Sequence, residues 1–345
     1  MTKARGLADL GNAYSDGALS NRNLIINGAM NVAQRGTSSG SVTGTGYVTV
    51  DRWKHAITAL GTYTAAQVSD GPSGFANSLR ITTDVADAAP AAADYAILQY
   101  VIEGQDVQRF GKGTPDAAPF TLSFWVKSNV TGTYTLSMVD TDNTRLAGAN
   151  YTVSVSGTWE YVSLTFPADT TGAFTDDNLS SLEIEFWLAS GSNWNTGAVP
   201  AAWEPMVIAD RNAGSTVNIA STIGNYFQIT GVQLEIGDTA TPFEHRGFGQ
   251  ELALCQRYYY QDTTASHFVR SFSCVSLGSL YEDYPLPTIM RTTPSVSVVL
   301  GTDVNKVSSV SILGRTTKAG YLIFQKSATG DGYTSVNKVT ADAEL

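Results

Sequence analysis

The sequence predicts an all-β chain in which an antiparallel jelly-roll β-sandwich is followed by a short helical linker and a smaller C-terminal β domain. Apolar and polar residues alternate over many short segments, turns rich in Gly, Thr and Asn separate these segments, and one stretch near residue 250 has helical spacing. Alternation with period 2 is typical of strands that bury one face. Many such strands joined by turns favour two antiparallel sheets packed face to face.

The composition is that of a globular protein. The chain has 345 residues, of which 43% are apolar and 15% charged, enough for one large or two ordinary domains. Its 21 Lys and Arg against 31 Asp and Glu give a formal net charge of −10, which repels a phosphate backbone, and no dense basic cluster reverses that sign locally. No apolar run reaches the ~18 residues of a membrane span. We therefore expect no nucleic-acid partner and no membrane insertion.

Residues 1–22 are rich in Gly, Ala, Asn and Ser and have no periodic apolar face. Such a segment buries too little apolar surface to offset its ordering entropy, so it needs a partner to become ordered. The alternative is a terminus without a role. The segment also lacks the apolar core of a secretory signal. We expect the chain to be made in the cytoplasm unless another route exports it.

The alternation fills residues 23–247. In FTLSFWVKS, Leu122, Phe124 and Val126 share one face, and Trp125 and Lys127 share the other. We expect the first set to face the core. Three further segments repeat the pattern with the inward sets Tyr134, Leu136 and Met138; Val162, Leu164 and Phe166; and Leu182, Ile184, Phe186 and Leu188.

Residues 248–262 contain the best helical stretch, with Leu252, Cys255 and Tyr259 at i, i+3 and i+7, and we predict a helical linker there. Residues 263–345 return to the strand pattern and predict a small second β domain. Burial alone stabilises a domain of about 80 residues marginally, so oligomerisation is expected to supply the rest. Cys255 and Cys274 are expected to be free thiols, because one cysteine pair in a large chain made in the cytoplasm is more often reduced than bonded.

Two segments resemble the opening and closing strands of the carbohydrate-binding-module-like jelly roll found in many tailed-phage virion proteins. They are NLIINGAMNVAQRG (23–36) and GVQLEIGDTATPFEHRGFGQELALCQRYY (231–259), and the ending TADAEL (340–345) is also similar to this phage family. The resemblance runs from residue 23 to about residue 260 and is loose in the middle. It implies that the first and last strands meet, as the strand pattern also suggests, with Leu24 and Ile26 beside Val232, Leu234 and Ile236.

The resemblance implies a non-enzymatic virion structural protein, assembled in the host cytoplasm and carried on the particle. We expect a tail or head fibre subunit, a homotrimer, that binds a host surface receptor such as a polysaccharide. Residues 1–22 would be the virion-docking arm that contacts other tail or head proteins. Two alternatives stay open: a virion connector or decoration protein without glycan binding, and a glycoside hydrolase or depolymerase.

Two tryptophans are predicted on outward strand faces. Trp125 alternates with Lys127, and Trp187 alternates with Glu183 and Glu185, so large rings lie beside charged groups. Aromatic rings stack on the C–H faces of sugars, and flanking charged and amide groups bind sugar hydroxyls. With the loop ASGSNWNTGAVPAAWEP added, the candidate glycan-binding or interface residues are Trp125, Lys127, Glu183, Glu185, Trp187, Asn193, Trp194 and Trp203. The alternative is that a neighbouring loop, subunit or virion protein covers the rings.

Three motifs match catalytic signatures only superficially. Glu183 and Glu185 have the ~7 Å spacing of a glycosidase carboxylate pair, but any Glu-x-Glu strand has it. GTSSG (36–40) matches the nucleophile elbow G-x-S-x-G without a helix after it, and predicts a loop. GKGT (111–114) lacks the first glycine of a phosphate loop, because that position is Asp106. We therefore predict no catalytic residues.

The resemblance also implies a structural Ca²⁺ where the first and last strands meet. Asn27, Asp51 and Glu235 could supply the hard oxygen ligands that Ca²⁺ prefers. DTDN (140–143) begins like an EF-hand loop, but Arg145 stands at the position that must be Gly. The three histidines are too scattered for a metal site, and no other cofactor is expected.

Overall fold

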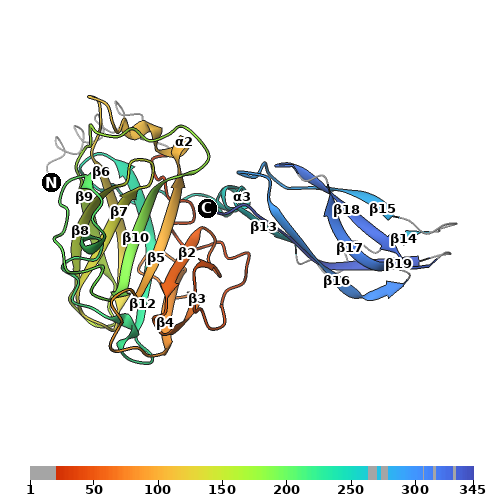
Figure 1. The fold of residues 1–345 in the computed structure, drawn as a ribbon, viewed down its shortest axis with the longest axis horizontal. Helices are drawn as coiled ribbons and strands as arrows, with labels where there is room; N and C mark the ends of the chain where they lie inside the picture. Colours follow the sequence, from red (N-terminus) through yellow and green to blue (C-terminus); the bar gives the residue numbers. More distant parts are fainter. Residues whose placement is uncertain (1–20, 263–269, 273–278, 306, 314–315, 329–331) are drawn as a thin grey trace. The chain divides into compact units, whose positions relative to one another are not determined.

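The computed structural model describes residues 21–262, 270–272, 279–305, 307–313, 316–328 and 332–345 (Figure 1). The chain divides into two compact units, Met1–Gly247 and Phe248–Leu345. This division falls where the sequence analysis ended the jelly roll. Of the predicted docking arm, residues 1–20 lie outside the described residues.

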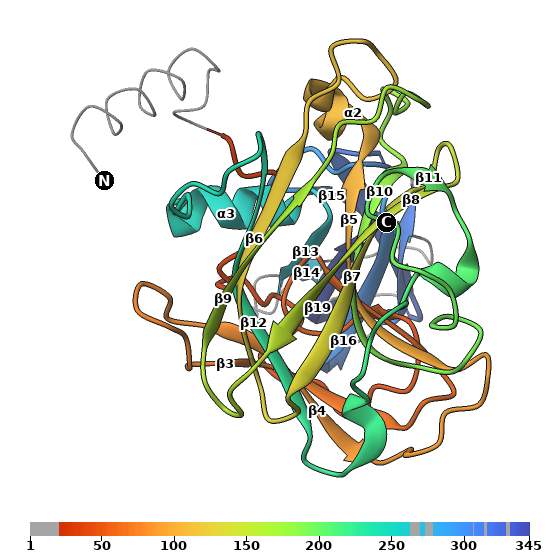
Figure 2. The same ribbon diagram turned by 90° about the vertical axis from the view of Figure 1, so that its left-hand side faces the viewer.

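Two sheets make up the first unit. The larger sheet has seven strands in the order β1 (Gly46–Tyr47), β2 (Trp53–Thr58), β5 (Tyr95–Glu103), β10 (Ser180–Ser190), β7 (Gly132–Asp140), β8 (Arg145–Val153) and β11 (Glu204–Pro205). The smaller sheet has five, in the order β3 (Thr62–Val68), β4 (Ser78–Val85), β12 (Tyr226–Ile236), β6 (Phe120–Ser128) and β9 (Glu160–Phe166). In Figures 1 and 2 the long strands β5, β10 and β7 run side by side through the larger sheet.

All pairings between the named strands of this unit are antiparallel, and the crossovers between the two sheets give the predicted jelly roll. One apolar core lies between the sheets, and the predicted inward residues belong to it. Leu122, Phe124 and Val126 of β6 are fully buried, and Phe124 packs edge-on against Phe186 of β10 with ring centroids 5.1 Å apart. The alternation therefore identified the inner faces of both sheets correctly, because burying alternate side chains is what a two-layer sandwich requires.

The start of the described chain lies beside β12, as predicted. The Leu24 amide donates to the Leu234 carbonyl at 3.0 Å, and the Val232 amide donates to the Gly28 carbonyl at 3.0 Å. A Cβ at residue 28 would lie 2.1 Å from the Val232 carbonyl oxygen, so this close approach requires glycine. The segment itself is not a named strand.

Short helices decorate the first unit: α2 (Gly104–Val107), η1 (Gln108–Phe110), η2 (Ile208–Asp210) and η3 (Ile219–Ser221). The second unit begins with α3 (Phe248–Gln256). The prediction of a helical linker over 248–262 is wrong at its C-terminal end. Residues 259–262 form strand β13 (Tyr259–Asp262), which pairs with β19, and Tyr260 packs against the apolar clusters of the second unit. No helix in the described part of the chain is long and apolar enough to cross a membrane.

The second unit is a small β domain, as predicted. One sheet orders β13, β19 (Gly332–Asp342) and β14 (Arg270–Phe272), with β16 (Ser295–Asn305) also paired to β19. The other orders β15 (Ser279–Pro285), β18 (Ala319–Lys326) and β17 (Val307–Leu313). Leu322 and Phe324 are fully buried. Cys255 is buried, whereas Cys274 lies outside the described residues, so the thiol prediction stays a prediction.

Candidate functional site

The structure splits the predicted glycan site between two sheets. Trp125 and Lys127 lie on β6 of the five-stranded sheet, and Glu183, Glu185 and Trp187 lie on β10 of the seven-stranded sheet. Residues next to each tryptophan face the shared core, so the two rings lie on opposite outer faces of the sandwich. The sequence could not show this, because alternation reports a face of a strand and not the sheet that contains it.

The prediction that Trp187 is exposed is wrong. Its ring is fully buried, although it points away from the central core. It belongs to a small apolar cluster with Ala56 and Ile97, against which Tyr95 and Trp194 pack. The Trp194 ring centroid lies 5.6 Å from that of Trp187, and the Trp194 indole N–H donates to the Ala93 carbonyl at 3.1 Å. A loop therefore covers the ring, which is the alternative that the sequence analysis left open.

The prediction that Glu185 is an exposed sugar ligand is also wrong. Glu185 is fully buried and forms an ion pair with Arg211, whose guanidinium lies over the rings of Trp187 and Trp194 at 5.6 Å and 5.3 Å. The loop stays against the sheet through further bonds, such as the Thr135 hydroxyl donating to the Ala213 carbonyl at 3.0 Å. The buried carboxylate thus serves to hold the covering loop.

Glu183 is half-buried and lies beside this ion pair. Its carboxylate accepts from the Gln99 amide at 2.8 Å, and the same amide lies 3.4 Å from Glu185. Burial raises the pKa of Glu183 above its ordinary value, and the charge of Glu185 raises it further. The two carboxylates thus share the Gln99 amide, and Glu185 in addition pairs with Arg211.

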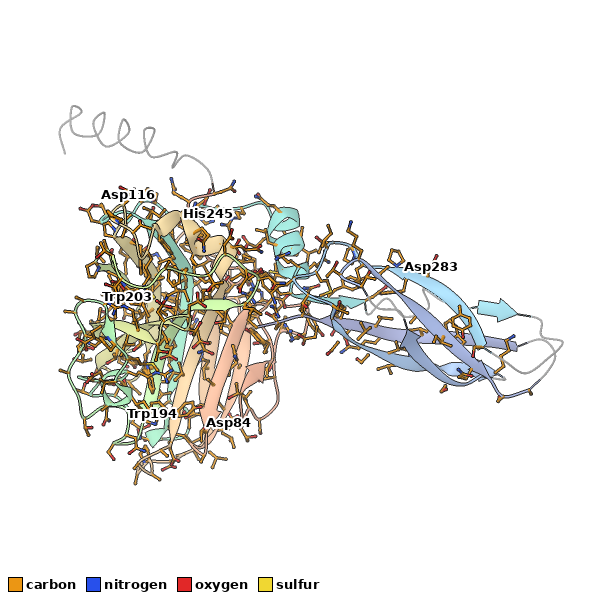
Figure 3. The ribbon with its side chains drawn as sticks, turned by 45° about the horizontal axis from the view of Figure 1, so that its top comes forward. Asp84, Asp116, Trp194, Trp203, His245 and Asp283 are labelled. Atoms are coloured by element: carbon orange, nitrogen blue, oxygen red, sulfur yellow. The ribbon has the colours of Figure 1, made fainter. Side chains whose placement is uncertain are left out.

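The other two loop residues differ in exposure. Asn193 is exposed, whereas Trp203 is 8% exposed and belongs to the central core, with its ring centroid 6.1 Å from that of Phe120. The prediction that Trp203 belongs to a surface site is therefore wrong. Figure 3 shows Trp194 and Trp203 at separate places on the first unit. Burial of Trp203 in the core stabilises the folded protein, because a large aromatic ring removes much apolar surface from water.

The five-stranded sheet keeps its outer face partly open. Trp125 on β6 is half-buried, and Tyr161 lies directly opposite it on the edge strand β9, with 49% of its surface exposed. Their ring centroids are 5.3 Å apart and the ring planes meet at 56°. The pair therefore presents an angled aromatic surface at the edge of the sheet.

An ion pair borders these rings. The Lys127 ammonium donates to the Asp70 carboxylate at 2.8 Å and lies 5.8 Å from the Trp159 ring centroid. Asp70 also accepts from the Trp159 indole at 3.3 Å and from Gln228 at 3.1 Å. The hydrogen bond from Lys127 is the main cause that lowers the pKa of Asp70 below its ordinary range. The charges are thus held in place beside an aromatic surface.

Further rings extend the surface across β12. Gly231, at a bulge in this strand, has a left-handed φ of 62°, and a Cβ there would lie 2.7 Å from the Phe75 ring and 3.1 Å from the Trp125 ring. Glycine is therefore needed for both rings to lie over the strand. Phe75 contacts Phe243 and His245 at centroid distances of 5.0 Å and 5.2 Å. We call the whole group the aromatic surface: Phe75, Trp125, Trp159, Tyr161, Phe243 and His245.

The sequence analysis missed most of the aromatic surface. The signal for Tyr161 was present, because the alternation that turns Val162 and Leu164 inward turns Tyr161 outward. No local pattern marked Asp70 or Phe75. Both lie in the loop between β3 and β4 and reach the sheet only through the fold.

The predicted calcium ligands meet only in part. The Asn27 side-chain amide donates to the Asp51 carbonyl at 3.0 Å, and the Asp51 carboxylate accepts from the Gln34 main-chain N–H at 3.0 Å. Glu235 lies with other partners and accepts from the Thr241 main chain and hydroxyl at 2.8 Å and 2.6 Å. Within the described ranges, no three His, Cys, Asp or Glu side chains gather as metal ligands. Structural calcium stays a prediction from the sequence.

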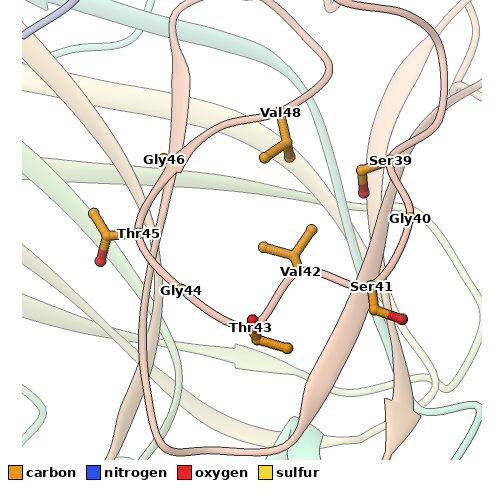
Figure 4. Close-up of a pocket in the computed structure, with 9 residues that line it drawn as sticks. All are labelled: Ser39, Gly40, Ser41, Val42, Thr43, Gly44, Thr45, Gly46 and Val48. Atoms are coloured by element: carbon orange, nitrogen blue, oxygen red, sulfur yellow. The ribbon is translucent and has the colours of Figure 1, made fainter.

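The GTSSG segment lies in a loop, as predicted, and bridges to β3 through Ser38 and Ala66. The end of this segment and the loop that follows line an open hollow of about 320 Å³, formed by Ser39, Gly40, Ser41, Val42, Thr43, Gly44, Thr45, Gly46 and Val48 (Figure 4). These lining side chains carry neither charge nor an aromatic ring. Apart from the two valines, the lining side chains offer only hydroxyl groups, so we place the candidate site at the aromatic surface.

No protein-family model matches the chain, and no curated protein matches it. Several solved structures resemble its fold at a distance. The enzymatically active domain of tailspike protein 4 of bacteriophage CBA120 is 14% identical with a TM-score of 0.34, over 63% of this chain and 22% of that one. The present chain thus matches about a fifth of that tailspike domain.

Two sugar-binding proteins are similarly distant. The family 11 carbohydrate-binding module of a cellulosomal cellulase of Clostridium thermocellum is 12% identical with a TM-score of 0.31, over 61% of this chain and 99% of that one. A putative sugar binding protein from Bacteroides thetaiotaomicron is 14% identical with a TM-score of 0.32, over 62% and 100%. Similarities as distant as these assign no function to the chain.

Proposed function

We propose that the chain is a non-enzymatic subunit of a bacteriophage virion fibre that binds a glycan of the host surface through the aromatic surface. The observation that carries the glycan part is the angled pair of Trp125 and exposed Tyr161 beside the Lys127–Asp70 ion pair. The phage part rests on the resemblance of residues 23–36 and 231–259 to virion jelly rolls. The docking role of residues 1–22 and the homotrimer belong to the same proposal.

The chemistry of the surface suits a sugar ring. Aromatic faces pack against the C–H face of a pyranose, while an ammonium and a carboxylate offer one donor and one acceptor for its hydroxyls. Because Lys127 and Asp70 already hold each other at 2.8 Å, they lose little side-chain freedom on binding. The angle of 56° between the rings fits a ligand that turns across the sheet edge better than a flat one.

A second candidate function is a virion connector whose partner is a protein. The same exposed Tyr161 favours it, because tyrosine and tryptophan are also the preferred anchors of protein interfaces. In that case the aromatic surface would be covered in the assembled particle, and its loss would impair assembly instead of adsorption.

Glycan binding by the purified protein distinguishes the fibre function from the connector function, and an exposed tyrosine elsewhere in the chain supplies the control. We would measure binding of the purified protein to a panel of bacterial surface polysaccharides, then compare Tyr161→Ala and Trp125→Ala with the control Tyr281→Ala. Tyr281 is 59% exposed and lies in the second unit, so it matches Tyr161 in exposure and chemistry. Loss of a stacking anchor should weaken glycan binding about tenfold or more, and the control should bind normally.

Adsorption of intact particles supplies the second readout. Mutant particles that assemble but no longer adsorb would support the glycan role. Mutant protein that fails to enter particles, while surviving particles adsorb normally, would favour the connector.

A further inference from the structure

A buried lysine lies between two carboxylates in the first unit. The Lys112 ammonium is 2.5 Å from the Asp140 carboxylate and 3.1 Å from the Asp169 carboxylate, and the two carbonyls of Thr171 and Gly172 accept from it at 3.0 Å and 2.7 Å. The side chains of the lysine, Asp140 and Asp169 are 3%, 0% and 6% exposed. An amine and a carboxyl group are thus held in contact away from water.

The Asp140 carboxyl is arranged for attack at its carbon. Its Oδ1 accepts from the Asn143 main-chain N–H at 3.0 Å and from the Asn143 side-chain amide at 3.2 Å. The same side-chain amide also lies 3.0 Å from Oδ2, so the main-chain N–H is the donor specific to Oδ1. Donors at Oδ1 stabilise the negative charge that this oxygen gains when a nucleophile adds to Cγ. The other oxygen, Oδ2, is the one in contact with Lys112.

Asp169 is placed to carry a proton. Arg145 donates to both of its oxygens at 2.8 Å and 3.1 Å, and the Thr171 N–H donates at 3.0 Å, which fixes the carboxylate beside the lysine. Burial works against the ionisation of Asp169, but these donors outweigh it and hold its pKa below the ordinary range. Asp169 is therefore held ionised, with a carboxylate oxygen 3.1 Å from the lysine Nζ that can accept a proton from it.

Two aromatic rings shield the amine. The Phe174 and Trp203 ring centroids each lie 5.1 Å from the Lys112 Nζ, and Trp203 is itself 8% exposed. Arg145 pairs with Asp169 in the same cluster, so two cations and two carboxylates balance their charges there.

We propose that Lys112 and Asp140 form an intramolecular isopeptide bond, with Asp169 as the proton carrier. A proton first moves from Nζ to Oδ2, which leaves a neutral amine and a carboxylic acid. Nζ then attacks Cγ, and the Nζ–Cγ bond forms. Asp169 takes one proton from Nζ and returns it to the departing hydroxyl, so the Cγ–Oδ2 bond breaks and one water leaves. Asp169 ends as it began, and no oxidant or cofactor is needed.

The link would tie the loop after η1 to the end of β7, closing 28 residues of chain. A covalent closure restricts the unfolded chain, as a disulfide does, but needs no oxidising compartment. This inference does not depend on the proposed glycan function.

The intact mass of the wild-type protein shows whether the isopeptide bond has formed. We would denature purified full-length protein and expect a mass lower than the sequence mass by one water, with a branched tryptic peptide that joins Lys112 to Asp140. An unchanged mass after prolonged incubation at neutral pH would overturn the proposal. A lost water located at any other residue would overturn it equally.

Variants test the roles of the groups. Asp169→Asn keeps both reacting groups and should stay at its full sequence mass, and a bond that forms completely in this variant would overturn the role of Asp169. Asp140→Asn should lose ammonia instead of water, because the Cγ–Nδ2 bond then breaks and the NH2 group leaves with one proton. The control is the Lys127–Asp70 pair, whose 2.8 Å contact has side chains 19% and 42% exposed and is expected to yield no cross-linked peptide.

Discussion

The two outer faces of the jelly roll have the same sequence pattern, but one is partly exposed to solvent and the other is covered. On β6 the outward Trp125 stays half-buried next to exposed Tyr161, whereas on β10 the outward Trp187 is fully buried beneath Trp194 and Arg211. In both strands the tryptophan alternates with core residues and has charged neighbours. The difference lies in the long loop after β10, which folds back over its own sheet.

A side chain on the outer face of a sheet is therefore not always exposed to solvent. Strand alternation sets which side of a sheet a residue occupies, and a covering loop then decides whether that side meets water. A buried outer face also changes what its charges do. Glu185 holds the loop through Arg211, while Lys127 and Asp70 remain available at the surface.

The largest expected difference between the faces is in tryptophan truncation. Trp187→Ala should lower the free energy of unfolding by about 3–5 kcal/mol, because it leaves a cavity under the loop. Trp125→Ala should lower it by about 1 kcal/mol or less, since its ring is partly exposed already. Urea unfolding followed by far-UV circular dichroism measures both, and equal losses would mean that the two faces do not differ as described.

Arg211→Ala should show the next largest effect. It leaves the fully buried Glu185 without its partner, which typically costs about 3 kcal/mol or more. The matched variant Lys127→Ala breaks a more exposed pair and should cost less than about 1 kcal/mol. Adding Glu185→Gln to Arg211→Ala should recover part of the loss, and no recovery would argue against the buried charge as its cause.

The smallest expected effect is a pH dependence of opposite sign on the two faces. The pKa of Glu183 is raised in the folded protein, so its ionisation costs stability, and this cost appears as the pH rises above the unfolded value. Glu183→Gln should therefore stabilise the protein at neutral pH and have no such effect in acid. The pKa of Asp70 is lowered, so its contribution is present above the unfolded value and is lost as the pH falls through the folded pKa.

Asp70→Asn should accordingly destabilise the protein slightly at neutral pH, and the difference from wild type should vanish in acid. Thermal melting of both variants between acidic and neutral pH checks the signs. For each variant, the quantity to follow is the change in melting temperature relative to wild type as the pH rises. The same sign of change in both variants at neutral pH would contradict the assignment of Glu183 to a covered face and Asp70 to an open one.

Much of the fold was predictable because its rules are local. The inward sets of β6 and β7 are buried, and Leu24 meets Leu234 as the pattern and the resemblance implied. The candidate site was less predictable. Trp125 and Lys127 were found, but Asp70 and Phe75 come from a loop with no periodic signal, and the predicted linker ends in strand β13 because its partner β19 lies far along the chain.

The sequence by itself determined the fold class and the inward faces of the strands, because side-chain alternation and turn residues act over a few neighbouring positions. Only the tertiary structure decided which outward residues are exposed, that Trp203 joins the core, and that Lys112 meets Asp140 and Asp169. Those outcomes depend on contacts between segments tens of residues apart. Such contacts follow from how sheets and loops pack together, and no short stretch of sequence specifies them.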